Sequence, residues 1–338
     1  MKFYAGIDLH SNNNYIGAID EKGRVVFQKK NPNDLETILK SLEPFKKHIK
    51  GTVVESTFNW YWLVDGLMEA DYKVHLANTT AIQQYSGLKH SDDKSDALWL
   101  AEMLRLKILP EGYIYPKETR GIRDLLRRRM QLVQQRTAML LSMKGMINNW
   151  TSIRVSRTNL KKLGREDISN IFSGSYEILS AQSLGEVIGV LNDQIKKIEK
   201  AVLQKVNLKK EFKRLLTVCG IGEILGTTIM LETGDIKRFP EVGDYSSYCR
   251  CVSSQKLTNS KKKGSGNKKN GNRYLAWAYV EAAHYMQRFS SKAKSWFQRK
   301  AAKRGKIVAT KALSNKIARA CYYIMKNRTV YNPKKMFG

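Results

Sequence analysis

Four carboxylates in the first third of the chain are placed so that they could bind a divalent metal ion. Asp8 and Glu55 each end a short apolar run, and Asp93 and Asp96 lie three residues apart at the start of a helical pattern. That spacing puts both acids on one face of a helix, which continues as an apolar stripe. Because a buried unpaired charge is costly, a metal ion is a natural partner. Carboxylates suit Mg²⁺, which could activate a nucleophile and stabilise the leaving oxygen of a phosphodiester.

The elements that must position these acids are predicted to form an α/β domain over residues 1–110. The apolar runs that end at Asp8 and Glu55 predict two of its strands. The expected order is strands at 3–8, 14–19 and 24–27, a helix at 33–42, a strand at 51–55, a helix at 60–68, a strand at 73–76 and a helix at 93–106. This order predicts a mixed sheet with helices on its faces.

Residues 111–215 are predicted to be a long helical region. Apolar residues recur at helical spacing from 122 to 150, and those from Leu184 to Val202 alternate in steps of four and three. The second pattern is typical of a coiled-coil seam. We expect an antiparallel helical hairpin, either as an ordinary bundle within one chain or as a coiled coil across a dimer. Ser, Asn and Gly between 151 and 183 predict an irregular tip.

Positive charge is concentrated in the last two thirds of the chain. Residues 1–110 hold 14 Lys or Arg and 14 Asp or Glu, whereas residues 111–338 hold 46 and 16, which accounts for the whole net charge of +30. Lys and Arg that contact a phosphate backbone release condensed counterions, so this imbalance predicts a nucleic acid partner. A merely solubilising surface would mix both signs.

Residues 216–338 are predicted to form a mostly α-helical, basic domain. It opens with Gly220-Ile221-Gly222, which either offers backbone N–H groups to phosphate, as helix-hairpin-helix modules do, or makes a tight turn before a core helix. Trp277, Tyr279 and Tyr285 are expected in the core. The residues expected to bind nucleic acid are Gly220, Gly222, Lys256, Lys261, Lys262, Lys263, Lys268, Lys269, Arg273, Arg127 and Arg128.

Six short motifs, in order along the chain, resemble one known family. They are Gly6-Ile7-Asp8-Leu9-His10, Val53-Val54-Glu55-Ser56, Lys94-Ser95-Asp96-Ala97 after Asp93, Cys219-Gly220-Ile221-Gly222, Phe239-Pro240, and the run from Lys263-Gly264 to Tyr274-Leu275. This set is similar to the DEDD transposases of the Piv/MooV type, the bridge-RNA-guided insertion-sequence recombinases.

The resemblance implies a RuvC-like, RNase H-like N-terminal domain with Mg²⁺ bound by Asp8, Glu55, Asp93 and Asp96. It implies a transposase that cleaves and exchanges DNA strands through a covalent protein–DNA intermediate. The implied partners are DNA (element ends and target), a structured guide RNA, and further copies of the chain in a dimer or tetramer.

The family also implies a serine nucleophile in the second domain, and here the sequence departs from the pattern. Thr258 stands where the family serine should fall, and Ser260 follows two residues later. Either hydroxyl could attack DNA. We favour Ser260, because a primary alcohol meets less steric hindrance, and place Ser254 third.

Two other function classes stay open at this point. One is a RuvC-like, structure-specific endonuclease of the Holliday-junction kind, in which water is the nucleophile. The other is a catalytically inactive relative that only binds nucleic acid. No uninterrupted apolar stretch of about 18 residues is present, so a membrane protein is not expected. Four cysteines without metal-site spacing fit a reducing cytoplasm, where we expect the chain to associate with the bacterial nucleoid.

Overall fold

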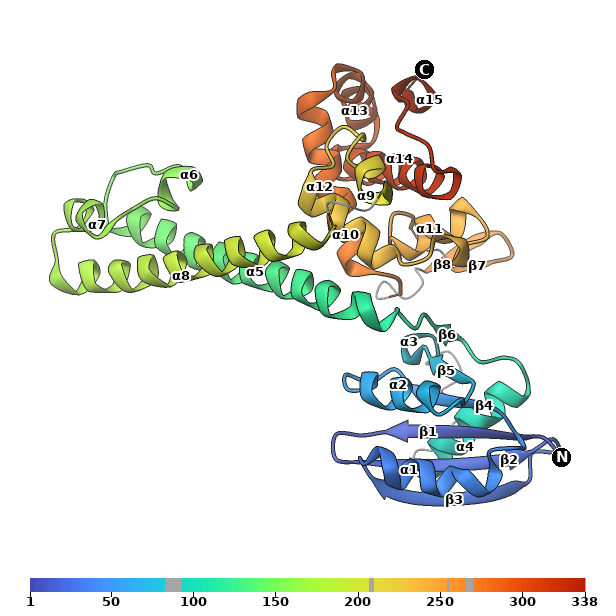
Figure 1. Ribbon diagram of the computed structural model, residues 1–338. Coiled ribbons are helices and arrows are strands. Elements are labelled where there is room, and N and C mark those ends of the chain that lie inside the picture. Colours follow the sequence, from blue (N-terminus) through green and yellow to red (C-terminus); the bar gives the residue numbers. More distant parts are fainter. Residues whose placement is uncertain (83–92, 207–209, 254–255, 265–269, 338) are drawn as a thin grey trace. The chain divides into compact units, whose positions relative to one another are not determined.

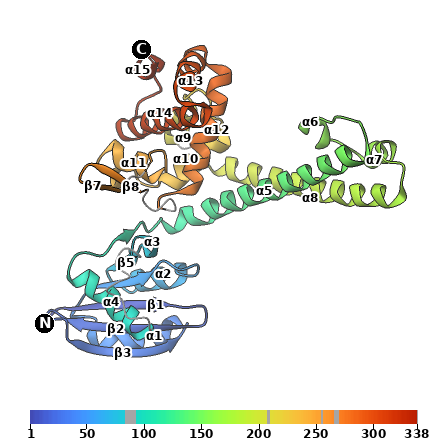
Figure 2. The same cartoon turned by 180° about the vertical axis from the view of Figure 1, so that it is seen from behind.

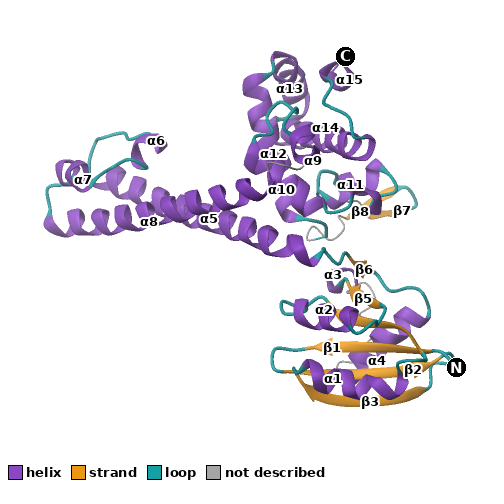
Figure 3. Ribbon diagram, in the orientation of Figure 1, coloured by secondary structure: helices purple, strands orange, loops and turns teal. Residues whose placement is uncertain are grey.

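The chain forms two compact units, Met1–Lys117 and Glu118–Gly338. A computed structural model describes residues 1–82, 93–206, 210–253, 256–264 and 270–337. The first unit is a mixed α/β structure and the second is mostly helical, as Figure 3 shows. The predicted change from α/β to α is therefore confirmed, whereas the further division of the second unit at residue 216 stays a prediction.

The first unit is built on one six-stranded sheet (Figure 1). Its strand order is β3-β2-β1-β4-β5-β6; β1 pairs with β2, β2 with β3 and β5 with β6 antiparallel, whereas β4 and β5 continue parallel to β1. The strands are β1 (Phe3–Leu9), β2 (Asn13–Asp20), β3 (Val25–Pro32), β4 (Ile49–Glu55), β5 (Val74–Ala77) and β6 (Glu111–Gly112). All the predicted strands are present, and the short edge strand β6 is an addition that the sequence pattern did not indicate.

Helices cover both faces of this sheet (Figures 1 and 2). On one face, helix α4 packs so closely on β1 that a side chain at Gly6 would lie 2.0 Å from the carbonyl oxygen of Ala97. On the other face, Ile7 of β1 belongs to a buried cluster with Ile38 and Leu63. The helices are α1 (Leu35–Leu42), the 3-10 turn η1 (Glu43–Phe45), α2 (Tyr61–Glu69), α3 (Thr79–Ile82) and α4 (Asp93–Arg105).

The second unit begins with a long antiparallel helical hairpin made of α5 (Lys117–Trp150) and α8 (Ser175–Val206). Arg129 on α5 pairs with Glu199 on α8 at 2.6 Å, and Arg136 donates to Asn192 at 2.8 Å, so the two helices run in opposite directions. Ile195 of the predicted seam is buried between them. The hairpin is confirmed within one chain.

The tip of this hairpin is more ordered than the sequence suggested. Two short helices, α6 (Arg157–Leu160) and α7 (Arg165–Ile171), lie between the long ones, and α8 starts nine residues before Leu184. Leu160, Ile168 and Phe172 are buried against the hairpin. The expectation of an irregular tip was wrong because these few apolar residues suffice to fold the polar segment onto the hairpin.

The remainder of the second unit is a helical bundle with one β-hairpin. Its core centres on three buried tyrosines, Tyr245, Tyr279 and Tyr322, and the hydroxyls of the first two lie 2.6 Å apart. The elements are α9 (Lys210–Leu215), α10 (Glu223–Thr233), η3 (Ile236–Arg238), α11 (Val242–Tyr248), β7 (Lys256–Thr258), β8 (Lys261–Gly264), α12 (Arg273–Phe289), α13 (Ser291–Arg304), α14 (Lys306–Asn327) and α15 (Pro333–Phe337). None of the described helices is long and apolar enough to cross a membrane.

Candidate functional site

Asp8 and Glu55 face the same helix because of the pleat of the sheet. Side chains alternate between the faces of a strand, so Asp8 shares the face of Gly6, against which α4 packs. On β4, Val53 is buried with residues of α4, so Glu55, two residues further on, points to that side as well. Strands β1 and β4 are parallel neighbours, and both acids therefore lie at the same edge of the sheet.

The environment of Asp8 is unfavourable for a lone negative charge. Its side chain is buried, with the residue only 3% exposed. Burial, a hydrogen bond with Glu55 and the negative charges of Glu55 and Asp96 raise the pKa of Asp8 to about 8, against a smaller opposing effect of His10. The Oδ2 atom accepts no hydrogen bond from the described residues, and Nδ1 of His10 lies 3.7 Å from it.

The other two predicted acids belong to helix α4. Asp93 is its first residue, but the Asp93 side chain lies outside the described part of the structure; Asp96 is half-buried one turn later. Among the described side chains, no group of three or more His, Cys, Asp or Glu residues is arranged to hold a metal ion. The donor chemistry nevertheless fits one, because crowded carboxylates and a buried carboxylate oxygen without a hydrogen bond both favour a hard cation.

Asp8 should hold a proton at neutral pH in metal-free solution. Since its pKa is raised to about 8, the folded chain binds more protons than the unfolded chain between the usual carboxyl pKa and about 8, so this group lowers stability as pH rises through that range. Infrared spectra of the full chain at about pH 6 should show a protonated carboxyl band that vanishes above about pH 8.

The matched control for this titration is Asp34, an exposed helix cap with a lowered pKa. Asp8→Asn should lose the infrared band. Asp34→Asn should keep it, because Asp34 with its lowered pKa is already ionised at about pH 6 and asparagine caps the helix about as well as aspartate. A band that persists unchanged in Asp8→Asn would show that another carboxyl group carries the proton.

Two asparagines that the sequence analysis did not name hold the loop that follows Asp8. Asn33 and Asn59 each donate from Nδ2 to the backbone oxygen of His10, at 2.9 and 3.0 Å. These bonds connect the loop after β1 to the loops that precede α1 and α2, and they fix the backbone two residues beyond Asp8. The sequence gives no spacing signal for them, because the three residues are far apart along the chain.

The two candidate nucleophiles lie on the β-hairpin of the second unit. Thr258 ends β7 and pairs with Lys261 of β8, so Asn259 and Ser260 form the two-residue turn. Both turn residues have positive φ, 49° and 60°, which is typical of a type I′ turn and is usually left to Asn or Gly. A serine held there is strained, and its side chain is exposed at the tip. The basic, glycine-containing composition of residues 256–273 is typical of a loop, but residues 256–264 form a strand pair.

The basic residues expected to bind nucleic acid differ in exposure and in how much of them the structure describes. Lys261, Lys263 and Arg273 are exposed. Lys256 and Lys262 lie in the hairpin strands with side chains that are not described, and Lys268 and Lys269 lie outside the described residues. Arg128 is exposed on α5 and donates to Gln131 at 2.6 Å.

Arg127 has a partner that sequence reasoning missed, the carboxylate of Glu232 on α10. Glu232 is 1% exposed. Arg127 donates from Nε to Oε1 at 2.6 Å and from Nη2 to Oε2 at 2.8 Å, and Nε of Arg123 donates to Oε2 at 3.1 Å. The guanidinium of Arg127 also stacks on the ring of Tyr274, 4.4 Å from its centroid. Phosphate binding by Arg127 stays a prediction, and any phosphate would compete with this ion pair.

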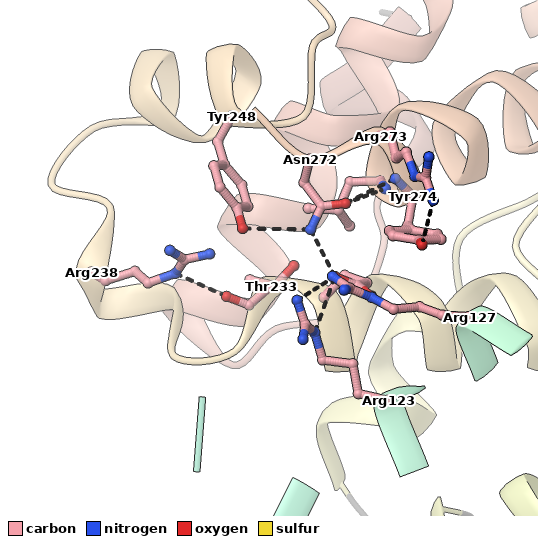
Figure 4. Close-up of polar contacts among 10 residues, drawn as sticks. Arg123, Arg127, Thr233, Arg238, Tyr248, Asn272, Arg273 and Tyr274 are labelled. Atoms are coloured by element: carbon pink, nitrogen blue, oxygen red, sulfur yellow. Dashed lines mark hydrogen bonds and ion pairs between the residues drawn. The ribbon is translucent and has the colours of Figure 1, made fainter. Parts of the chain in front are cut away.

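The same carboxylate also holds Asn272, which lies in the segment that leads into α12 and is labelled in Figure 4. Nδ2 of Asn272 donates to Oε2 of Glu232 at 2.7 Å, while Oδ1 of Asn272 accepts from the backbone of Tyr274 and Leu275 and so caps α12. Burial alone would raise the pKa of Glu232, but the hydrogen bond and charge of Arg127 and the charge of Arg123 outweigh it and lower the pKa. One buried anion therefore connects α5, α10 and α12.

The two motif glycines differ in what they do. Gly220 has a φ of 88°, and a side chain there would lie 2.6 Å from the carbonyl oxygen of Ala282, so the fold itself requires glycine. Gly222 is the N-cap of α10 without a side-chain cap, and the space beside it is open. Core packing accounts for the first glycine and not for the second.

Comparison with known proteins matches both parts of the chain to transposases. A DEDD transposase model of the IS110 type matches residues 5–150, and the model of the IS116/IS110/IS902 transposase family matches residues 212–298. A probable family 20 transposase of Pseudomonas aeruginosa is 24% identical over 285 residues, covering 81% of this chain and 82% of the relative. The transposase of insertion sequence element IS1328 from Yersinia enterocolitica is 29% identical over 148 residues, 43% of this chain and 44% of the relative.

Proposed function

Because the chain belongs to the DEDD transposases of the IS110 family, we propose that it cuts and rejoins DNA strands with Mg²⁺ at its acidic site and a hydroxyl nucleophile from its second unit. The family implies a divalent metal ion, and the observation that carries the proposal is the convergence of Asp8 and Glu55 on the face of the sheet covered by α4. The strand order of the first unit supports an RNase H-like fold for this site.

The acids of the first unit would hold the cation. Asp8, Glu55 and Asp96 supply carboxylate oxygens, and Asp93 at the start of α4 is the fourth proposed ligand. Bound Mg²⁺ would supply a Lewis acid for the phosphate oxygens. The residues themselves do the positioning: the parallel strands fix Asp8 against Glu55, and the bonds to the His10 backbone keep the adjoining loop in place.

Ser260 is the proposed nucleophile. Attack of its hydroxyl oxygen on a DNA phosphate would form a phosphodiester between the chain and one strand end and break the bond from phosphorus to the oxygen of the other strand end. The serine hydroxyl loses its proton in this step, and the departing oxygen takes up a proton to become a hydroxyl. A type I′ turn presents the hydroxyl at an exposed tip with positive side chains beside it, those of Lys261 and Lys263, which suit an approaching phosphate. The alternative nucleophile is Thr258, which lies two residues earlier, at the end of β7.

Separate alanine variants should identify the nucleophile. Ser260→Ala is expected to lower strand transfer on the order of a thousandfold or more, because the hydroxyl that forms the ester is lost, while Thr258→Ala keeps most of the activity. Excision and insertion of the element can be counted on a plasmid that carries this gene with its natural flanking DNA. Ser295→Ala, an exposed serine on α13, is the control for losing a hydroxyl from the same unit.

The opposite pattern would assign the role to Thr258. Full activity in both single variants would remove both residues from consideration and leave Ser254, which lies outside the described residues, as the next candidate. If wild-type protein cuts DNA without forming a protein–DNA adduct, water is the nucleophile.

We also propose a structured guide RNA and further copies of the chain as partners. Residues 118–338 carry 45 Lys or Arg against 15 Asp or Glu, enough for more than one polyanion. The helical hairpin exposes Leu141, Leu179, Val187 and Val190, which supports a coiled-coil contact between chains. Sequencing of RNA that co-purifies with the chain, and the mass of the complex in solution, test these two points; a nucleic-acid-free monomer would contradict both.

A further inference from the structure

We propose that a cavity between α5, the start of α10 and α12 binds one unstacked nucleotide of a single-stranded nucleic acid. The cavity has a volume of about 750 Å³ and lies entirely within the second unit. That volume is in the range of sites that enclose a small organic molecule, roughly 300–1,000 Å³. The inference rests on the proposed function, since it assumes that the chain handles nucleic acid strands.

One wall of the cavity is an aromatic stripe on α12. Trp277 and Tyr285 line it, with Glu281 between them, at a spacing of four residues that places all three on one side of the helix. Tyr285 is 42% exposed, whereas Tyr279 of the same helix is fully buried in the core. The expectation that Tyr285 belongs to the core was therefore wrong. Its exposed ring, which has the guanidinium of Arg288 5.8 Å from its centroid, could stack on a base.

The part of the lining that comes from α5 is cationic. Arg136 and Arg129 line it; Arg129 is paired with Glu199, and Nη1 of Arg136 donates to Asn192. Arg136 is half-buried, and burial together with the positive charge of Arg129 lowers the pKa of Arg136. A phosphate group of a ligand in the cavity would offset this concentration of positive charge.

The open space beside Gly222 gives the ligand room to approach the backbone. Its φ of −88° suits any residue, and a side chain would meet no atom within 4 Å, so neither strain nor packing explains the glycine. Glycine at such a position permits a ligand to lie directly against the main chain. Gly220, by contrast, is explained by its contact with α12.

The whole lining suits a nucleotide better than a free anion. Glu223 and Glu281 also border the cavity, and carboxylates repel a phosphate but accept hydrogen bonds from the N–H groups at the edge of a base. The ring faces and the carboxylates therefore match a base, and the arginine matches a phosphate. A base can enter only when it is unstacked, so the site selects single strands over duplexes.

The test is a binding titration with the full-length chain. The probes are a fluorescently labelled single-stranded DNA 12-mer, the RNA of the same sequence, and the DNA duplex. Tyr285→Ala should weaken single-strand binding about tenfold or more and change duplex binding less than about twofold. Tyr323→Ala, which removes a similarly exposed tyrosine from α14 outside the cavity, should change neither. The single-stranded probe, DNA or RNA, whose affinity falls more in Tyr285→Ala identifies the nucleic acid that supplies the nucleotide.

Two variants that remove the same charge distinguish binding in the cavity from a general electrostatic effect. Arg136→Gln and Arg304→Gln remove the same charge, but Arg304 is exposed on α13 away from the cavity. A larger loss of single-strand affinity for Arg136→Gln supports the site. Equal Kd values for Tyr285→Ala and Tyr323→Ala would overturn it while leaving the proposed function intact, whereas wild-type protein that binds none of the probes would overturn both.

Discussion

Replacing Asp8 by asparagine should reduce DNA strand cleavage by at least about a hundredfold at saturating Mg²⁺. Asp8 is buried between Glu55 and helix α4, and loss of one carboxylate oxygen displaces a cation that has to be held within fractions of an ångström. Glu55→Gln and Asp96→Asn should have the same effect, since the acids act as one site. Cleavage of labelled DNA from the element's ends measures it.

Folding and nucleic acid binding should survive these changes. Asp8→Asn removes a carboxyl group with a pKa of about 8, so at alkaline pH the variant should be more stable than wild type without metal, because the wild-type chain then carries a buried charge. Asp34→Asn is again the matched control and should cleave at the wild-type rate. If Asp8→Asn cleaves DNA as fast as Asp34→Asn, Asp8 is not a ligand of the metal ion.

Glu232→Gln should cost about 3–5 kcal/mol of stability in the second unit. The change leaves Arg123 and Arg127 without the charge that compensates them, and weakens the bond that holds Asn272 at the start of α12. Because the pKa of Glu232 is lowered in the folded chain, its contribution is present above the usual carboxyl pKa and lost as pH falls through the folded value. Hydrogen exchange of α10 and α12 should accelerate at neutral pH, and the difference from wild type should shrink in acid.

Glu186→Gln provides the comparison for a surface ion pair. Glu186 and Arg165 are both exposed, and removing such a pair costs only about 0–1 kcal/mol. Equal protection of α12 in Glu232→Gln and Glu186→Gln would contradict the role of the buried carboxylate as the link among α5, α10 and α12.

The framework of the acidic site could be predicted from the sequence because it depends on local patterns. An apolar run that ends in an acid predicts a strand with a carboxylate at its edge, and both Asp8 and Glu55 lie where this pattern puts them. These features need only a few neighbouring residues to define them.

Features that depend on distant partners could not be predicted in this way. Arg127 on an amphipathic helix suggested an exposed, phosphate-binding cation, but its partner Glu232 is 105 residues away, and no sequence spacing connects the two. The strained turn at Ser260 was also hidden, because Asn-Ser is a weak turn signal compared with Asn-Gly. The β-hairpin forms because residues of β7 and β8 on either side of this turn pair with each other.

The most direct test of the account is to look for a covalent bond between the chain and DNA. Wild-type protein is incubated with labelled DNA from the element's ends, its co-purified RNA and Mg²⁺, denatured, digested, and searched by mass spectrometry for a peptide linked to a nucleotide. The account predicts an adduct on Ser260 that is absent after chelation of the metal and absent in Asp8→Asn. DNA cut by wild-type protein without any adduct would contradict it and make water the nucleophile.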